Sequence, residues 1–266
     1  MESRGLLRTL PQRITQLHSK KPSPPGWFRP RARKIARKPL RTISVIVPAH
    51  NEESYIAQTL DALKRQNYPH FEVIVVANGC TDGTAEVAQT KCDRLIVLSQ
   101  KSLGVARNLG ARMAKGEILM FLDADTRLEP MALRVVSENF SKRDAAATLR
   151  GAPDVDRFRY HLLYLYKNFT HRTSLHRGSS GVIICWRKHF MGAGGFDEGL
   201  EVCENSELIA RLRRFGKYIF IGDASATTSM RRYEQRGFWP MFLVWAKLWV
   251  RSVFGDLHRR HYEPVR

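Results

Sequence analysis

The fold is decided by one stretch of eight residues, Ile118–Asp125, which reads ILMFLDAD. A short, continuous apolar run predicts a strand buried on both faces, and open α/β folds place their ligands at the C-terminal end of such a strand. Side chains two apart in an extended segment point the same way, so Asp123 and Asp125 are expected to converge on one site. Two carboxylates suit Mg²⁺ or Mn²⁺, and such an ion can hold a diphosphate leaving group. The alternative is a polar strand end leading into a helix N-cap.

Strand and helix patterns alternate on the N-terminal side of this stretch. Each predicted strand is a short β-branched or apolar run, and each predicted helix carries apolar residues three or four apart. Such alternation favours a parallel sheet with right-handed crossovers. The strands are predicted at 42–47, 71–77 and 94–98, and the helices at 54–66, at 81 or 82 to 89, and at 104–115.

The pattern on the C-terminal side is less regular. A helix is expected to open at Pro130, because proline is favoured in the first turn. The segment 156–177, rich in aromatic residues, Arg and His, is predicted to be a helical insertion. The remaining expected elements are strands at 145–150, 180–186 and 217–221, a glycine-rich loop at 192–198, and helices at 204–215 and 237–254.

The charge of the chain is high and unevenly placed. The 266 residues carry a formal net charge of +19, and residues 1–41 alone hold 12 Lys and Arg residues against one acid, Glu2. Such a balance favours anionic lipid headgroups, nucleic acid or nucleotide phosphates as partners. Nucleic acid is the least favoured of these, because the excess lies mainly in a proline-rich leader and no nucleic-acid module is recognised.

The cysteines and the apolar runs bear on the compartment. The four cysteines include no CxxC pair, which indicates free thiols in a reducing compartment. Arg4, Arg8 and Arg13 interrupt any signal peptide, and no run reaches the roughly 18 apolar residues of a spanning helix. A cytoplasmic location is therefore expected.

Five motifs occur together in one order and spacing. They are VPAHNE at 47–52, NGCTDGT at 78–84, GVARNLGA at 104–111, FLDAD at 121–125 and GGFDE at 194–198. In this set the chain resembles a family 2 glycosyltransferase of the GT-A fold, over roughly residues 42–232. The resemblance implies an α/β, Rossmann-like domain with a mainly parallel sheet and flanking helices. It also implies transfer of a sugar from a nucleotide-sugar, a UDP- or GDP-sugar, normally with inversion at the anomeric carbon and with help from Mg²⁺ or Mn²⁺.

The resemblance divides the chain into three parts. Residues 1–41 are expected to be a basic leader, disordered or lying on a lipid surface. Residues 42–232 form the transferase domain, with a nucleotide-sugar half at 42–126 and an acceptor half at 127–232. Residues 233–266 form an aromatic and basic C-terminal helix.

The resemblance also implies a donor site. In it, Glu52 accepts hydrogen bonds from a ribose or a base, unless it only complements a helix N-terminus. The family's frequent Asp-Asp pair is replaced by Ala77-Asn78, which leaves the identity of the base open. The metal-binding pair is Asp123 and Asp125, and the donor-binding residues are Pro48, Ala49, Asn51, Glu52, Asn78, Asp82, Gly104, Arg107, Asp123, Arg231 and Arg232.

Two arginine positions carry alternatives. Arg107 matches the segment that passes the diphosphate and offers a phosphate fork; the alternative is a surface arginine on a helix. Arg231 and Arg232 follow the last predicted strand. They can hold the donor diphosphate or an acceptor phosphate, or form a solvated basic turn.

The general base departs from the family pattern. The family carries a Glu-Asp pair after GGFDE, and its Asp deprotonates the acceptor hydroxyl. This chain has Glu204-Asn205-Ser206-Glu207, and the amide of Asn205 cannot take a proton at neutral pH. Glu204 is the first substitute and Glu207 the second, although acids at a helix start also complement the macrodipole. The alternative function is a catalytically impaired transferase that binds a nucleotide or a partner.

The C-terminal helix is unusually aromatic. Phe242, Trp245 and Trp249 are spaced for one helical face, and Lys247 and Arg251 can snorkel from it. Tryptophan with basic residues suits a membrane interface, whereas the alternative is a helix docked on the protein's own core. With the basic leader, this predicts a peripheral enzyme on the inner face of the membrane, acting in cell-envelope, polysaccharide or glycolipid synthesis on a sugar or lipid-linked acceptor.

Overall fold

The structure, a computed structural model, describes residues 40–173, 178–179, 181–200 and 202–254. Parts of four predicted segments lie outside the described residues. These parts are 1–39 of the leader, 174–177 of the helical insertion, the first residue of the strand predicted at 180–186, and 255–266 of the C-terminal segment. The described residues belong to one compact unit that begins at Lys38.

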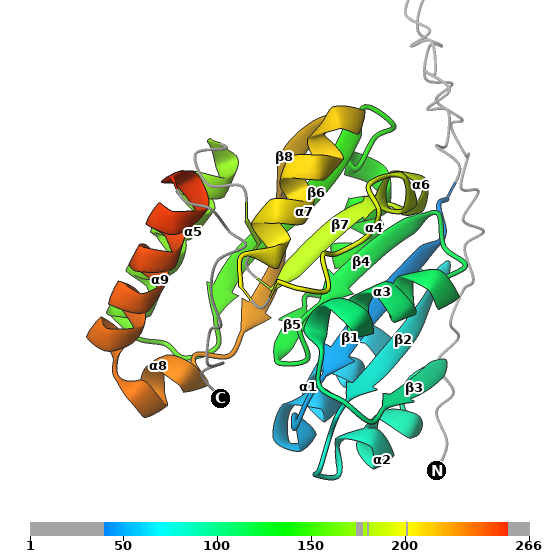
Figure 1. Ribbon diagram of the computed structural model, residues 1–266, viewed down its shortest axis with the longest axis horizontal. Helices are drawn as coiled ribbons and strands as arrows, with labels where there is room; N and C mark the ends of the chain where they lie inside the picture. The colour runs from blue at the N-terminus through cyan, green and yellow to red at the C-terminus, as the bar shows by residue number, and fades with distance from the viewer. Residues whose placement is uncertain (1–39, 174–177, 180, 201, 255–266) are drawn as a thin grey trace, which may run out of the picture. The chain divides into compact units, whose positions relative to one another are not determined.

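Within the described residues, eight strands form one sheet in the order β3-β2-β1-β4-β7-β6-β8-β5 (Figure 1). The strands β1, β2, β3 and β4 pair in parallel, β7 runs antiparallel to both β4 and β6, and β8 runs parallel to β6 and antiparallel to β5. The strands are β1 Ile43–Ala49, β2 Phe71–Asn78, β3 Arg94–Leu98, β4 Ile118–Leu122, β5 Thr126–Leu128, β6 Asp144–Pro153, β7 Val182–Trp186 and β8 Lys217–Thr228.

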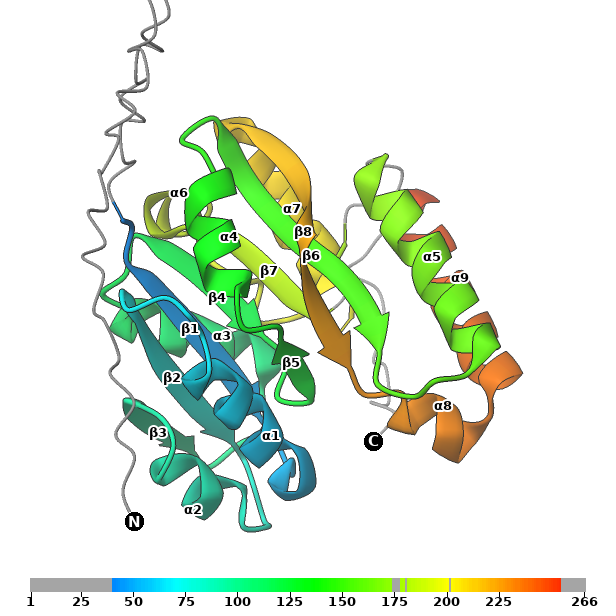
Figure 2. The same cartoon turned by 180° about the vertical axis from the view of Figure 1, so that it is seen from behind.

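Helices cover both faces of the sheet. The helices α3, α6 and α7 lie on the face seen in Figure 1, and α1, α2 and α4 lie on the opposite face (Figure 2). The helices are α1 Glu53–Lys64, α2 Thr84–Gln89, α3 Leu103–Met113, α4 Ala132–Asn139, α5 Phe158–Arg172, α6 Arg187–Gly192, α7 Glu204–Leu212 with a 3₁₀ turn at Arg213–Phe215, α8 Arg231–Arg236 and α9 Phe238–Phe254.

The strand β4 divides two hydrophobic cores. Met120 and its neighbours at alternate positions pack with α1, α2 and α4, whereas Leu119 and Phe121 pack with α3, α6 and α7. All five side chains of β4 are buried. The prediction of a strand buried on both faces is thus confirmed, as is the α/β fold with flanking helices.

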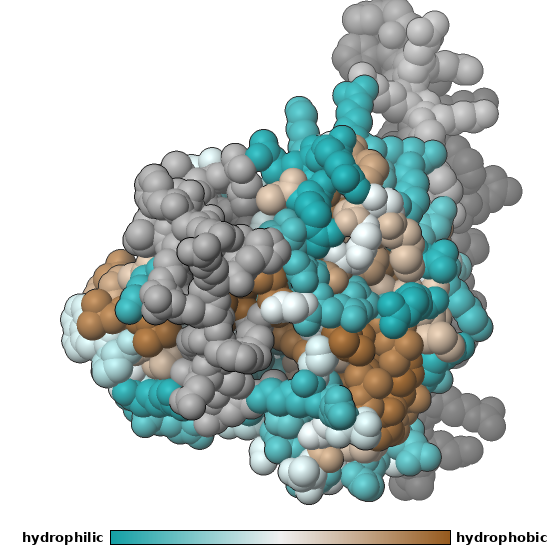
Figure 3. All heavy atoms as spheres, viewed as in Figure 1, coloured by the Kyte–Doolittle hydropathy of each residue, from teal (hydrophilic) through white to brown (hydrophobic). Residues whose placement is uncertain are grey.

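A third, smaller cluster lies where α5, α8 and α9 meet. Tyr160, Leu163 and Tyr164 of α5 pack there with Tyr233 of α8 and Met241 of α9. Figures 1 and 2 both place α5 and α9 side by side. In the view of Figure 3, hydrophobic side chains also reach the surface over α9. No helix within the described residues has the length and apolar character needed to cross a bilayer.

Several predicted elements need correction. The strand predicted at 217–221 continues to Thr228, because its pairing with β6 resumes after a bulge: Leu149 pairs with Ile221, but Arg150 pairs with Ser225. Gly222 and Asp223 in that bulge have the composition of a turn. The short elements β5, α6 and α8 were not predicted. Phe242, expected on the membrane-facing side of α9, packs against the third cluster instead.

Candidate functional site

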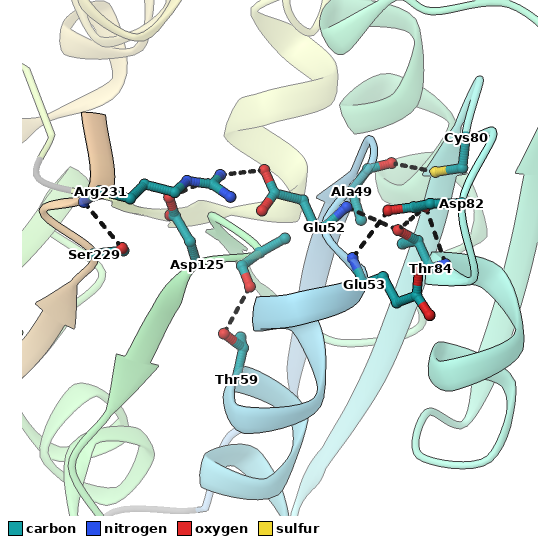
Figure 4. A network of polar contacts seen from close by, with 11 residues as sticks. Ala49, Glu52, Glu53, Thr59, Cys80, Asp82, Thr84, Asp125, Ser229 and Arg231 are labelled. Atoms are coloured by element: carbon teal, nitrogen blue, oxygen red, sulfur yellow. Dashed lines mark hydrogen bonds and ion pairs between the residues drawn. The ribbon is translucent and has the colours of Figure 1, made fainter. Parts of the chain in front are cut away.

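A turn after β4 carries the two aspartates. Thr126 donates from its backbone N–H to the carbonyl of Asp123 (3.0 Å), which closes the turn. The buried Ala124 between the aspartates accepts a hydrogen bond from the Thr59 hydroxyl of α1 (2.7 Å, Figure 4). The carbonyl of Asp125 accepts from the backbone N–H of Ser229, at the end of β8 (3.1 Å). The turn is therefore held by both an adjacent helix and a distant strand.

Asp125 lies on the β8 side of the turn, against Arg231. The guanidinium Nη2 of Arg231 is 3.2 Å from Asp125 and 2.5 Å from Glu52 (Figure 4). The guanidinium also lies over the Tyr55 ring at 4.3 Å. Burial raises the pKa of Asp125 to about 6, and the charge of Asp123 adds to this, whereas Arg231 opposes it. This side of the site thus holds a crowded group of carboxylates with an arginine among them.

Glu52 sits at the N-terminus of α1 and is almost fully buried. Its backbone N–H donates to the Thr84 hydroxyl (2.8 Å), and its Oε1 accepts from Arg231. Its Oε2 is buried and has no hydrogen-bond partner among the described residues. A buried carboxylate oxygen of this kind is costly unless a ligand supplies a donor. The predicted ribose or base contact of Glu52 stays a prediction.

Arg107 lies on the other side of the turn, and its side chain is only 4% exposed. Its guanidinium donates to Asp123 (3.2 Å), Glu204 (2.9 Å) and the Oδ1 of Asn205 (3.0 Å). It also lies over the Phe196 ring at 4.9 Å. The alternative of a surface arginine is therefore wrong. Its Nη1 and Nη2 atoms, which were expected to fork a phosphate, donate to side chains of the protein, whereas its buried Nε has no hydrogen-bond partner among the described residues.

The residue at the family's base position, Asn205, and the two candidate bases, Glu204 and Glu207, differ in their contacts. Asn205 donates from its amide to Ser179 (3.0 Å) and accepts from Arg107. Glu207 is held in a double contact by Arg211, one helical turn later, at 2.5 Å for each oxygen. Of the two carboxylates, Glu204 is the one that shares an arginine with Asp123.

The loops after β1 and β2 are joined by polar side chains. Asn51 has a positive φ of 52° and accepts from the backbone N–H of Thr81 (2.9 Å). Asp82 accepts from the backbone N–H of Glu53 (3.2 Å) and of Thr84 (3.1 Å). Asn51 and Asp82, both predicted to bind the nucleotide-sugar, thus fix the two loops against each other. Recognition of the base by Asp82 stays a prediction.

Five further predicted residues lie in the walls of the site. Asn78 is buried, and its Oδ1 accepts from the backbone N–H of Ser102 at the start of α3 (2.7 Å). Pro48 and Ala49 are buried at the end of β1. A Cβ on Gly104 would lie 3.0 Å from the Cα of Glu198, so glycine lets α3 approach the GGFDE loop. Arg232 is half-buried at the start of α8.

The sequence interpretation missed three residues of the site. Tyr55 and Thr59 lie one helical turn apart on α1, and this i, i+4 spacing was a usable signal. Tyr164 of α5 is buried, and burial raises its pKa to about 12. Nothing in the aromatic segment 156–177 indicated that one of its tyrosines would reach the last strand.

Part of the chain is similar in sequence to curated glycosyltransferases. The curated relatives include a glycosyltransferase, AglE, of Haloferax volcanii, 43% identical over 91 residues (31% of this chain, 30% of the relative). TuaG of Bacillus subtilis, a putative teichuronic acid biosynthesis glycosyltransferase, is 34% identical over 120 residues (43% of this chain, 47% of the relative). The matches span less than half the length of these relatives.

Solved structures share the fold. TarS 1–349 of S. aureus in complex with UDP has a TM-score of 0.57 at 20% identity, covering 71% of this chain and 60% of that chain. The mannosyltransferase PcManGT from Pyrobaculum calidifontis, in complex with GDP-Man and Mn²⁺, has a TM-score of 0.56 at 22% identity, covering 70% and 56%. The family model of Glycosyl transferase family 2 matches residues 44–234, most of the described domain. The chain therefore belongs to glycosyltransferase family 2.

Proposed function

We propose that this chain is a metal-dependent, inverting glycosyltransferase that moves a sugar from a nucleoside diphosphate sugar to an acceptor hydroxyl. The observation that carries the proposal is the pair of aspartates after β4, linked through Arg107 to Glu204 and flanked by Arg231 and Glu52. Such a displacement needs a pair of metal-binding carboxylates and, beside it, a third carboxylate that acts as the base.

Asp123 and Asp125 would hold Mg²⁺ or Mn²⁺. Among the described residues, no cluster of three or more acidic, His or Cys side chains fits a metal, so an ion would need oxygen ligands from elsewhere. A diphosphate has such oxygens, and Mg²⁺ is usually bound by one or two carboxylates with substrate phosphates. The grouping of Asp123, Asp125 and Glu52 favours a bound cation, because the negative charges of Asp123 and Glu52 make ionisation of Asp125 less favourable. When bound, the ion would neutralise charge on the leaving diphosphate.

Glu204 would take the proton of the acceptor hydroxyl. It lies against the same guanidinium as Asp123, whereas Glu207 is held along its own helix by Arg211. Asn205 would help to position Arg107 and Glu204, since its amide joins Arg107 to Ser179. The alternative of a catalytically impaired transferase is not favoured, because a carboxylate remains one residue from the family's base position.

The donor is proposed to be a UDP- or GDP-sugar, since the solved neighbours hold UDP or GDP-Man. The donor-binding set would be the predicted residues on the β1, β2 and α3 loops with Arg231 and Arg232. Relatives named for teichuronic acid synthesis and for poly(ribitol-phosphate) modification support a role in the cell envelope. We propose a cytoplasmic enzyme, peripheral on the inner face of the membrane, that acts on a sugar or lipid-linked acceptor.

The experiment is a thermal-shift panel of nucleoside diphosphates and nucleotide-sugars with and without Mn²⁺, on the wild type and on Asp125→Ala. Stabilisation by one base, only with metal and lost in the variant, is the expected result. The matched control is Asp223→Ala, which removes an exposed aspartate in the β8 bulge and should keep the response. A flat panel in the wild type would count against a working donor site.

A further inference from the structure

A stripe of exposed apolar side chains runs along the outer face of α5. Its members recur at helical spacing of four, three, one and three residues, which places them within about a third of the helix circumference. The side chain of each member is more than half exposed. Single exposed apolar residues are ordinary on a protein surface, whereas a contiguous stripe of them is not. The α5 stripe consists of Phe158, Leu162, Leu165, Tyr166 and Phe169.

The opposite face of the same helix is already used. Tyr160, Leu163 and Tyr164 point into the third cluster, where α8 and α9 supply its other residues. The internal packing of α5 is therefore satisfied without the stripe. The neighbouring helix α9 also exposes apolar residues beyond those in the cluster, namely Trp239, Leu243 and Trp245. Burying the α5 stripe needs something outside the described fold.

The charge around these helices selects an occupant. Over residues 156–172 and 232–247 there are seven Lys and Arg residues against two acids, Asp156 and Glu234. Arg157 and Arg159, at the start of α5, are about half exposed and pair with Glu234. Arg172 lies at its end, and Lys247 is exposed on α9. Apolar side chains flanked by basic residues match the interface of an anionic bilayer, where the acyl region takes the former and headgroups the latter.

We propose that the α5 stripe inserts into the interface of an anionic lipid bilayer, with the exposed residues of α9 alongside it. A second copy of the chain is less suitable, because two such faces would bring many positive charges together. This inference deepens the proposed function, on which its substrate part rests. The inner face of α5 packs against β8, and Thr228 at the end of β8 accepts a hydrogen bond from the hydroxyl of Thr126, the residue after Asp125 (3.2 Å). One helix would thus touch lipid on one side and the site on the other, so the acceptor would be a lipid-borne hydroxyl or phosphate.

The test is sedimentation of the full chain with vesicles of phosphatidylcholine and phosphatidylglycerol at about 0.15 M salt, where surface charge is screened beyond about 8 Å. The double variant Leu162→Glu/Leu165→Glu should lose at least about tenfold in vesicle partitioning, because two apolar contacts become charged. The matched control is Met113→Glu, an exposed apolar residue at the end of α3, which should bind like the wild type. The basic leader is the same in all three, so their difference isolates α5.

Three results would overturn the inference: equal sedimentation of the double variant and the wild type, equal binding to vesicles of phosphatidylcholine alone, or a wild-type dimer in solution that the double variant converts to monomer. Melting temperatures and nucleotide stabilisation with Mn²⁺ are measured on the same samples. Lost vesicle binding with an intact nucleotide response supports the inference. Vesicle binding by a wild type that ignores every nucleotide would refute the proposed function and leave membrane docking standing.

Discussion

The two sides of the Asp123–Asp125 turn are built differently. On one side, Arg107 comes from α3 in the core, is almost fully buried and contacts Asp123, Glu204 and Asn205 at once. On the other side, Arg231 comes from the short helix α8 and contacts Asp125 and Glu52. Its side chain is 18% exposed.

The two arginines therefore differ in role. Arg107 is a fixed brace, which holds other side chains in place, and Arg231 is a replaceable counter-charge, whose place near Asp125 a metal ion can take. Arg107 pairs with two carboxylates from distant parts of the chain, Asp123 and Glu204, so its loss leaves both without this partner. Arg231 supplies positive charge close to where a divalent ion would sit, so a metal would compete with it for Asp125. A metal would then displace Arg231 more readily than Arg107, and α8 would be the helix that responds to donor binding.

The largest effect is expected from Arg107→Ala. Removing the brace leaves Glu204 poorly solvated without its partner, so the free energy of unfolding should fall by about 3 kcal/mol. Sugar transfer should fall by at least about a hundredfold, because Asp123 and Glu204 lose their common anchor. Urea denaturation and donor turnover measure the two effects. Arg107→Lys is the companion variant: it keeps the charge without the planar fork, and should recover part of the stability and little of the activity. Wild-type values for both variants would contradict a brace.

The next effect concerns the base. Glu204→Gln keeps the size of the side chain and removes the proton acceptor, so kcat should fall by about 10²–10⁴-fold with little change in the donor KM. Glu207→Gln is its matched control on the same helix, since Glu207 contacts Arg211 rather than Arg107. It should keep kcat within a few-fold. The opposite ranking would transfer the role of base to Glu207.

The fold around this turn was predictable where local pattern decides it. The expected strands at 71–77, 94–98 and 117–122 agree with β2, β3 and β4 to within a residue, because each is a short apolar run bounded by polar residues. The full length of β8 was not predictable, because Gly222 and Asp223 have the composition of a turn and the predicted strand ended before them. Only pairing with β6 carries the strand past them.

The site was predictable as a set of residues and not as a set of contacts. The motifs drew attention to Arg107, Glu204 and Asp123, but nothing in the helix 104–115 tells that Glu204, 97 residues later, lies 2.9 Å from Arg107. Likewise Arg231 reaches Glu52 across 179 residues. Such contacts depend on how α7 and α8 pack on the sheet, and packing of this kind is not written in periodicity or spacing.

A moderate effect is expected from Arg231→Gln. Removing the competing charge beside Asp125 should raise the apparent affinity for Mn²⁺, in the absence of nucleotide, by about tenfold, which is about 1.4 kcal/mol. The measurement is a Mn²⁺ titration followed by electron paramagnetic resonance of the free ion. The matched control is Arg232→Gln, one residue away, for which the change should be smaller because Asp125 pairs with Arg231. An unchanged or weaker Mn²⁺ affinity in Arg231→Gln would contradict the replaceable counter-charge.

The smallest effect is expected from Asn205→Asp, although this change restores the residue that the family places there. The new carboxylate would join Asp123 and Glu204 around Arg107, and the hydrogen bond that the amide donates to Ser179 would be lost. That loss should cost about 1 kcal/mol of stability. If Glu204 is the working base, a second carboxylate adds little, and kcat should stay within about threefold of the wild type. A large gain in turnover would instead mean that the wild type lacks an effective base, so the brace at Arg107 would be holding together a site impaired by a single amide.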